Sequence, residues 1–174
     1  MCVYSACDRQ NSIGGCDLFS RIFIEGIGWS EEHNLGSSVN SRYWETQASF
    51  SPDGKYLYFI SNRDGGVGGD DIWRSEITEH GFMQAENLGS LINTRYNEMS
   101  PFLHPDNLTF YFASNGHIGM GDYDIYVSRR LSGDKQWRFP ENIGYPINTH
   151  NVDNSLVVSN DGRTAYYTSN HSGS

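Results

Sequence analysis

The chain has 174 residues, the size of one ordinary domain. Its 12 basic and 21 acidic residues give a net charge of −9, which argues against DNA, RNA or an anionic membrane as the main partner, because these need a basic surface. Aromatic residues make up 14% of the chain and there are 19 glycines, a combination that favours short strands and tight turns over helices.

From the first residues we expect no targeting signal. Residues 1–8 read as a polar and aromatic strand, without the basic and apolar segments of a signal peptide. No run of 18 apolar residues occurs, so we expect no membrane span. The sequence therefore predicts either a cytosolic protein or a natural N-terminus that lies further upstream.

The sequence repeats itself at a nearly constant spacing. The Asn-Leu-Gly at 34–36 returns at 87–89, a step of 53 residues, and as Asn-Ile-Gly at 142–144, a further step of 55. The Asp-Ile-Trp at 71–73 returns as Asp-Ile-Tyr at 124–126, and an earlier copy is visible as Asp-Leu-Phe at 17–19. Such self-similarity predicts a repeat architecture.

One repeat contains four strand signals in chain order. Residues 46–51 form the first, and the tight turn Pro52-Asp53-Gly54 leads to a second, apolar strand at 55–61. A glycine-rich loop over 62–70 precedes the third strand at 71–77, and the fourth starts near Phe82. Four antiparallel strands repeating at about 50 residues are typical of a β-propeller blade.

We therefore predict an all-β fold, a β-propeller segment of four-stranded antiparallel blades that supplies about three blades of a larger ring. A partial blade covers residues 1–28, whole blades cover 29–81 and 82–136, and a second partial blade covers 137–174. Because a propeller ring needs about four to eight blades, we expect the chain to be a segment of a longer protein.

Several segments resemble a known family. The runs at 51–55, 58–63 and 71–73 are similar to TolB-type, WD-repeat-like propeller repeats. The runs at 87–101 and 114–121 more narrowly resemble the propeller region of OmpA-family cell-envelope lipoproteins of Gram-negative bacteria. In that family the propeller precedes a peptidoglycan-binding OmpA-like domain, and some members belong to a secretion and gliding apparatus.

The resemblance implies a location in the periplasm, associated with the outer membrane, and a scaffolding role. It implies partners among envelope proteins or in a peptidoglycan-associated assembly, and it offers no catalytic residues. The last unit departs from the pattern, because Asn160 stands where the turn proline belongs.

The topology predicts where a partner binds. In an up-and-down blade, the second loop and the blade-to-blade connection lie at the same end. Both are long here, and loops usually carry function. We predict a recognition surface from their blade-specific residues: Arg63, Asp64, His117, Met120, Tyr123, Trp44, Tyr96 and His150.

Two sets of carboxylates recur between the repeats. Asp71 and Asp124 are expected to cap the backbone amides of the loop that precedes them. Glu45, Glu98 and Asp153 stand near the start of the innermost strand. They are expected either to ring the central channel, where they would join the binding residues, or to pair between blades.

The cysteines and histidines allow one covalent link and predict no metal. Cys7 and Cys16 bracket the loop of the first partial blade, which suits a disulfide, although two unpaired buried thiols fit equally well. Cys2 is left over in either case. The six histidines are scattered, the acidic loop at 63–71 lacks the ligand pattern of a calcium loop, and nothing predicts a cofactor.

Two functions fit this pattern. The leading one is a non-catalytic binding or scaffolding module, because no catalytic motif is present. The alternative is the propeller domain of a glycan-active enzyme, in which Arg42 and Arg95 bind an anionic sugar beside acidic groups. That alternative needs carboxylates at the separation used in glycoside hydrolysis.

Overall fold

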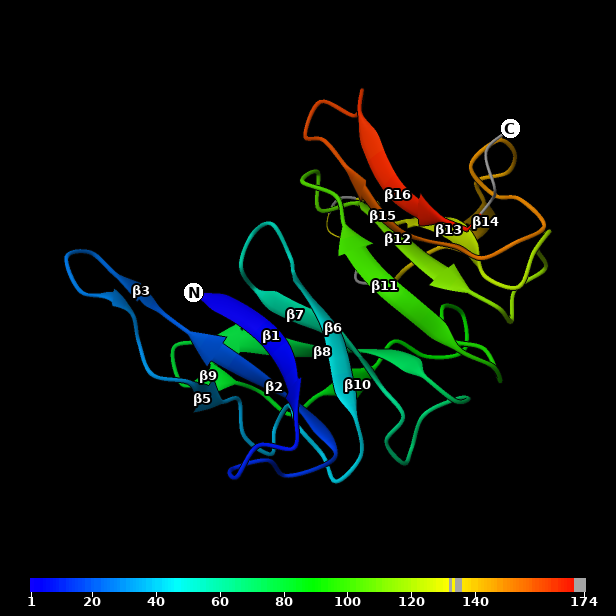
Figure 1. The fold of residues 1–174 in the computed structure, drawn as a ribbon. Coiled ribbons are helices and arrows are strands. Elements are labelled where there is room, and N and C mark those ends of the chain that lie inside the picture. Colours follow the sequence, from blue (N-terminus) through cyan, green and yellow to red (C-terminus); the bar gives the residue numbers. More distant parts are fainter. Residues whose placement is uncertain (132, 134–135, 171–174) are drawn as a thin grey trace.

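A computed structural model describes residues 1–131, 133 and 136–170, and within these ranges every regular element is a β-strand (Figure 1). None of the described segments forms a helix with the length and apolarity of a membrane span. The prediction of an all-β propeller segment is confirmed.

Two complete blades stand in the middle of the chain, each a meander of antiparallel strands. The first blade has the order β6-β7-β8-β10, and the short β9 pairs with the end of β8. The second has the order β11-β12-β13-β14. Their bounds are β6 Glu45–Phe50, β7 Tyr56–Ser61, β8 Asp71–Thr78, β9 Gly81–Phe82, β10 Glu86–Asn87, β11 Glu98–Leu103, β12 Thr109–Ser114, β13 Asp124–Arg129 and β14 Glu141–Asn142.

Smaller sheets flank the two complete blades. On the N-terminal side a three-stranded sheet has the order β1-β2-β5, with a separate β3–β4 hairpin, and on the C-terminal side β15 pairs with β16. Their bounds are β1 Cys2–Cys7, β2 Cys16–Arg21, β3 Phe23–Ile24, β4 Gly28–Trp29, β5 His33–Asn34, β15 Asp153–Val158 and β16 Ala165–Ser169.

The sheets and the sequence units differ in phase. The sheets of the two complete blades run from 45 to 87 and from 98 to 142. Each therefore begins inside one of the units 29–81 and 82–136 and ends inside the next. The sequence repeat predicts the number of residues from one sheet to the next, but it does not predict the residue at which each sheet begins or ends.

The blades fan out around a common axis. Figure 1 shows β6, β11 and β15, the first strands of three successive sheets, side by side on the inner side of the fan. The second strand of each blade is buried on both faces. Leu57 and Phe59 pack with Leu18 of the preceding sheet, while Tyr58 and Ile60 pack with Phe110 of the following one. Burial on both faces explains why residues 56–61 are a continuous apolar run rather than an alternating one.

A buried asparagine joins each blade-to-blade connection to the third strand of its sheet. The side-chain oxygen of Asn93 accepts a hydrogen bond from the Ile72 amide at 2.8 Å, and its Nδ2 donates to the Ile72 carbonyl at 3.0 Å. Asn40 binds Leu18 in the same way. The third equivalent pair is Asn148 and Ile125. Each asparagine side chain thus makes the backbone hydrogen bonds with one residue of the third strand that a neighbouring strand would otherwise make.

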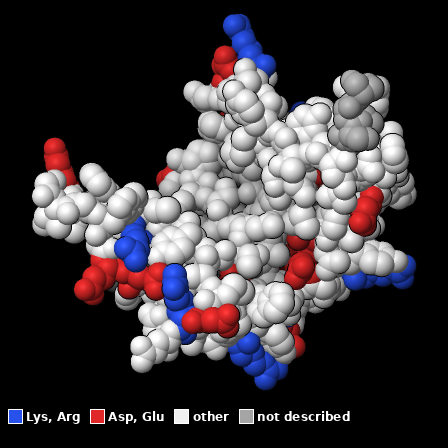
Figure 2. Space-filling view, viewed as in Figure 1, with Lys and Arg blue, Asp and Glu red and all other residues white. Residues whose placement is uncertain are grey.

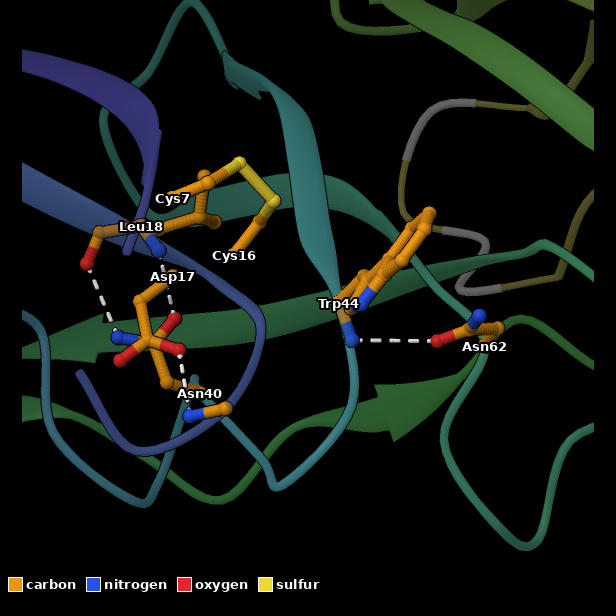
Figure 3. The surroundings of a disulfide bond; sticks show 8 residues. Cys7, Cys16, Asp17, Leu18, Asn40, Trp44 and Asn62 are labelled. Carbon is orange, nitrogen blue, oxygen red and sulfur yellow. Dashed lines mark hydrogen bonds between the residues drawn. A yellow bond between two sulfur atoms is a disulfide. The ribbon is translucent and has the colours of Figure 1, made fainter. Parts of the chain in front are cut away.

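The first partial blade contains a disulfide bond. Cys7 and Cys16 are direct partners across β1 and β2 and are covalently joined, whereas Cys2 is unpaired and exposed. Figure 3 shows the bond near Trp44, which lies on the connection one residue before β6. The disulfide closes the loop at 8–15 against which Trp44 packs, since a Cβ on Gly15 would lie 2.3 Å from the Trp44 Nε1.

The buried asparagine predicts a large stability effect. Asn93→Ala leaves the N–H of Ile72 without a partner and its C=O with the Leu88 amide alone, where Asn93 and Ile72 are both fully buried. We expect the free energy of unfolding to fall by about 2–4 kcal/mol, measured by urea titration. The matched control is Asn160→Ala in an exposed turn, with an effect of about 0.5 kcal/mol or less. Equal losses in the two variants would contradict the bridging role.

The disulfide predicts a thiol count and a stability change. The unfolded, unreduced protein should have one titratable thiol, Cys2, and reduction should lower the free energy of unfolding by about 2–3 kcal/mol for a loop this short. Cys2→Ser should leave no thiol and the same stability as the parent. Three thiols in the unreduced protein would show that the bridge does not form.

Candidate functional site

The two kinds of long loop meet at one end of the blades. The loop between the second and third strands donates to the connection that enters the next blade, through Gly69 N to the Tyr96 oxygen at 2.7 Å and Asp122 N to the Asn151 oxygen at 3.2 Å. In the first partial blade, Gly15 N donates to the Tyr43 oxygen at 2.9 Å. We call the surface formed by residues 8–15, 35–44, 62–70, 88–97, 115–123 and 143–152 the loop face.

Glycines in the loop face allow two backbones to touch. A Cβ on Gly68 would lie 2.2 Å from the Thr94 oxygen, and one on Gly121 would lie 2.1 Å from the Asn151 oxygen. No side chain fits at such distances, so these positions must be glycine for successive blades to pack. The glycine-rich composition of these loops therefore reflects close packing.

Aspartates at the start of the third strands cap the same loops, as predicted. Asp71 accepts from the amides of Val67 and Gly68. Asp124 accepts from Met120 and Gly121. The result is a set of loops whose backbone is fixed by hydrogen bonds before any partner arrives.

The recurring carboxylates Glu45, Glu98 and Asp153 are buried, which corrects their expected position in the channel or between blades. All three side chains have no exposed surface. Glu98 accepts hydrogen bonds from the Thr94 amide, the Thr94 hydroxyl and the Ser114 hydroxyl at 2.9, 2.8 and 2.6 Å. The three carboxylates hold each connection to the start of an innermost strand. They therefore do not belong to the predicted binding residues.

Local sequence held the signal for this role. A hydroxyl residue stands four positions before each of the three carboxylates, as in the Thr94–Glu98 pair, and it supplies two of the hydrogen bonds. Burial raises the pKa of the Glu98 carboxyl, while the hydrogen bonds from Ser114 and Thr94 lower it. The net pKa is raised, as expected for a carboxyl group removed from water.

Arg63 also points inward rather than toward a partner. Its side chain is 9% exposed and pairs with Glu45 at 3.0 Å, and its guanidinium lies 5.2 Å from the centre of the Phe59 ring. A second hydrogen bond reaches the Val39 carbonyl. Burial lowers the pKa of Arg63 and the nearby Glu45 raises it.

In the next blade His117 has the same structural role as Arg63, although its side chain is an imidazole rather than a guanidinium. Its Nε2 lies 2.8 Å from the Ile92 carbonyl, which is equivalent to Val39, and its ring packs on Phe112 and Tyr126. Arg63 and His117 differ in type because each fits its own blade. Their difference therefore does not indicate a ligand.

Other predicted residues are exposed on the loop face. Trp44 is 60% exposed, Met120 52% and Tyr96 45%. Asp64 and His150 are also exposed, and Tyr123 is half-buried. The Trp44 amide donates to the side chain of Asn62 at 3.1 Å, which fixes the base of the exposed indole (Figure 3).

Two arginines on the loop face are paired with tyrosines. Arg42 and Arg95 each donate to the hydroxyl of the next residue, Tyr43 or Tyr96, at 2.8 and 2.7 Å, and each lies over that ring. Arg42 also pairs with Asp64 at 2.7 Å. The hydrogen bond from Tyr43 lowers the pKa of Asp64. This pair is exposed on both sides, so it contributes little to stability.

An exposed apolar residue recurs in each loop, and the sequence predicted only its copy at Met120. Ile13, Val67 and Met120 occupy equivalent positions, four residues before the capping aspartates, and are 44%, 39% and 52% exposed. Ile118 is 97% exposed beside them. The repeated spacing to the aspartate was a signal that could have added Ile13 and Val67 to the prediction.

The loop face has the composition of a protein-binding surface. Exposed Trp, Tyr and Met side chains with Arg are enriched where proteins contact one another. Within the described residues, no three His, Cys, Asp or Glu side chains are grouped to hold a metal ion. The chemistry offered is apolar contact and hydrogen bonding by aromatic and guanidinium groups.

No protein-family model and no curated protein matches the chain. Among solved structures, a putative TolB from Agrobacterium tumefaciens is similar, with a TM-score of 0.51 and 18% identity over 96% of this chain and 54% of that one. TolB from Acinetobacter baumannii has a TM-score of 0.46 and 13% identity, over 99% of this chain and 47% of its own. The chain spans about half the length of these structures, and the first similarity shows that it has a TolB-like β-propeller fold.

Proposed function

We propose that the chain is a non-catalytic β-propeller binding module that scaffolds an assembly of the bacterial cell envelope through its loop face. The observation that carries this proposal is the exposure of Trp44, Tyr96 and Met120 on loops that are hydrogen-bonded to one another. Large exposed side chains on a fixed backbone bind at a low cost in conformational entropy.

The envelope location is supported by two features. Segments of the sequence resemble the propellers of OmpA-family lipoproteins, and the fold is shared with TolB proteins. A disulfide between Cys7 and Cys16 suits an oxidising compartment such as the periplasm. We therefore place the protein in the periplasm, near the outer membrane, with envelope proteins or a peptidoglycan-associated assembly as partners.

The burial of the recurring carboxylates favours binding over glycan cleavage. Glycoside hydrolysis needs a pair of carboxyl groups that reach the substrate. Glu45, Glu98 and Asp153 have no exposed surface and are occupied by hydrogen bonds. Arg42, which the enzyme alternative assigns to an anionic sugar, already pairs with Asp64.

Site-specific photo-crosslinking tests the proposal. A photoreactive amino acid at position 44, 96 or 120, in the protein expressed in the periplasm of a Gram-negative host, should give discrete adducts with envelope proteins. The same amino acid at Pro52 or Asp161, in the turns between first and second strands, should give none. With a partner purified from these adducts, Trp44→Ala should weaken binding about tenfold or more.

The matched control is Lys55→Ala, an exposed change at the turn end of a blade, which should leave affinity for the partner unchanged. Thermal unfolding of both variants checks that the fold is intact. Adducts of equal yield from both ends of the blades, or none from the loop face, would refute the proposal.

A further inference from the structure

The three innermost strands share an unusual backbone conformation. Gln47, Ser100 and Ser155 have positive φ angles of 50°, 55° and 57°. Each sits at a β-bulge, where the register of β6, β11 or β15 against its neighbour slips. Outside glycine this conformation is strained, and bulges and strain of this kind are concentrated at functional sites.

Side chains at these bulges explain why none of the three residues is glycine, which would adopt the conformation without cost. The Ser100 amide donates to the Gln47 Oε1 of the neighbouring blade at 2.6 Å. The hydroxyls of Ser100 and Ser155 lie 3.3 Å apart. Successive bulges thus form a line of polar groups across three blades, and Gln47 and Ser155 remain exposed.

This line of polar groups lies in a groove of about 320 Å³ on the axis side of the fan. Three residues from each strand line it, at 47–49, 100–102 and 155–157. None of the nine is charged. Figure 2, which looks onto the inner side of the fan, shows a hollow in the middle of the view that is mostly free of charged residues.

We propose that this axial groove binds a neutral polyhydroxylated ligand, an uncharged sugar unit of an oligosaccharide. The Ser hydroxyls and the Gln amide can each donate and accept hydrogen bonds, as sugar hydroxyls do. Phe102 and Val157 supply an apolar wall for the C–H face of a sugar ring. The absence of charge in the lining disfavours phosphates and acidic sugars.

An extended peptide is the weaker candidate for the groove. A peptide binds a sheet edge by adding a strand, which needs a regular row of backbone donors and acceptors. The bulges interrupt this row at the same level on β6, β11 and β15, and bulges are a common means of blocking edge pairing. The groove is distinct from the loop face, and its assignment does not depend on the proposed function.

Binding of neutral disaccharides tests the proposal. Maltose, cellobiose and diacetylchitobiose are titrated into the full chain and followed by saturation-transfer NMR and amide chemical shifts. At least one should bind saturably and shift the amides of residues 47–49, 100–102 and 155–157. Ser155→Ala should weaken that binding about three- to tenfold, the loss of one hydrogen bond. Ser155→Trp, which fills the groove, should abolish it.

The matched control is Ser5→Ala, an exposed serine on β1 outside the groove and the loop face, which should leave disaccharide affinity unchanged. Thermal unfolding confirms that each variant is folded. The proposal is overturned by the absence of saturable binding to all three disaccharides, or by binding that Ser155→Trp does not reduce. Preferential binding of glucuronic acid or of a blocked alanine-serine peptide to the same residues would also overturn it.

Discussion

The buried asparagine amide is the interaction on which the rest of the structure depends. In each blade it satisfies both backbone groups of one third-strand residue, as Asn93 does for Ile72, and so it sets where the connection turns back toward the axis. The connection then delivers Glu98, whose buried carboxylate fixes the start of the innermost strand. Because buried polar groups without partners are costly, the hydrogen bonds of the asparagine and those of the carboxylate depend on one another.

The sequence predicted those parts of the molecule that recur. The strand order, the long-loop end and the capping by Asp71 all follow from repeated residues with a stated physical role. Comparison between repeats was less informative for Arg63 and His117, because different side chains reach the same carbonyl position from their own blades. Variation between repeats therefore records local packing as well as recognition, and only burial separates the two.

The bulges of the innermost strands could not be predicted from the sequence. Nothing in the identity of Gln47, Ser100 or Ser155 indicates a positive φ, because a left-handed residue in a strand is normally signalled by glycine. One hint was present. Pro101 lies inside β11, and proline within a strand is confined to edges and bulges. Which loop side chains face outward was likewise settled by tertiary packing, as Ile118 illustrates.

The loop face and the axial groove, the two surfaces proposed to bind partners, are linked through a single strand in each blade. In the first complete blade, Trp44 is exposed on the loop face, the next residue, Glu45, is buried, and Gln47 opens the axial groove two residues later. A strand whose first residue is locked by hydrogen bonds to Ser41 and Ser61 holds both its loop and its bulge in place. The buried carboxylate therefore acts on both proposed surfaces indirectly, by fixing the backbone that presents them.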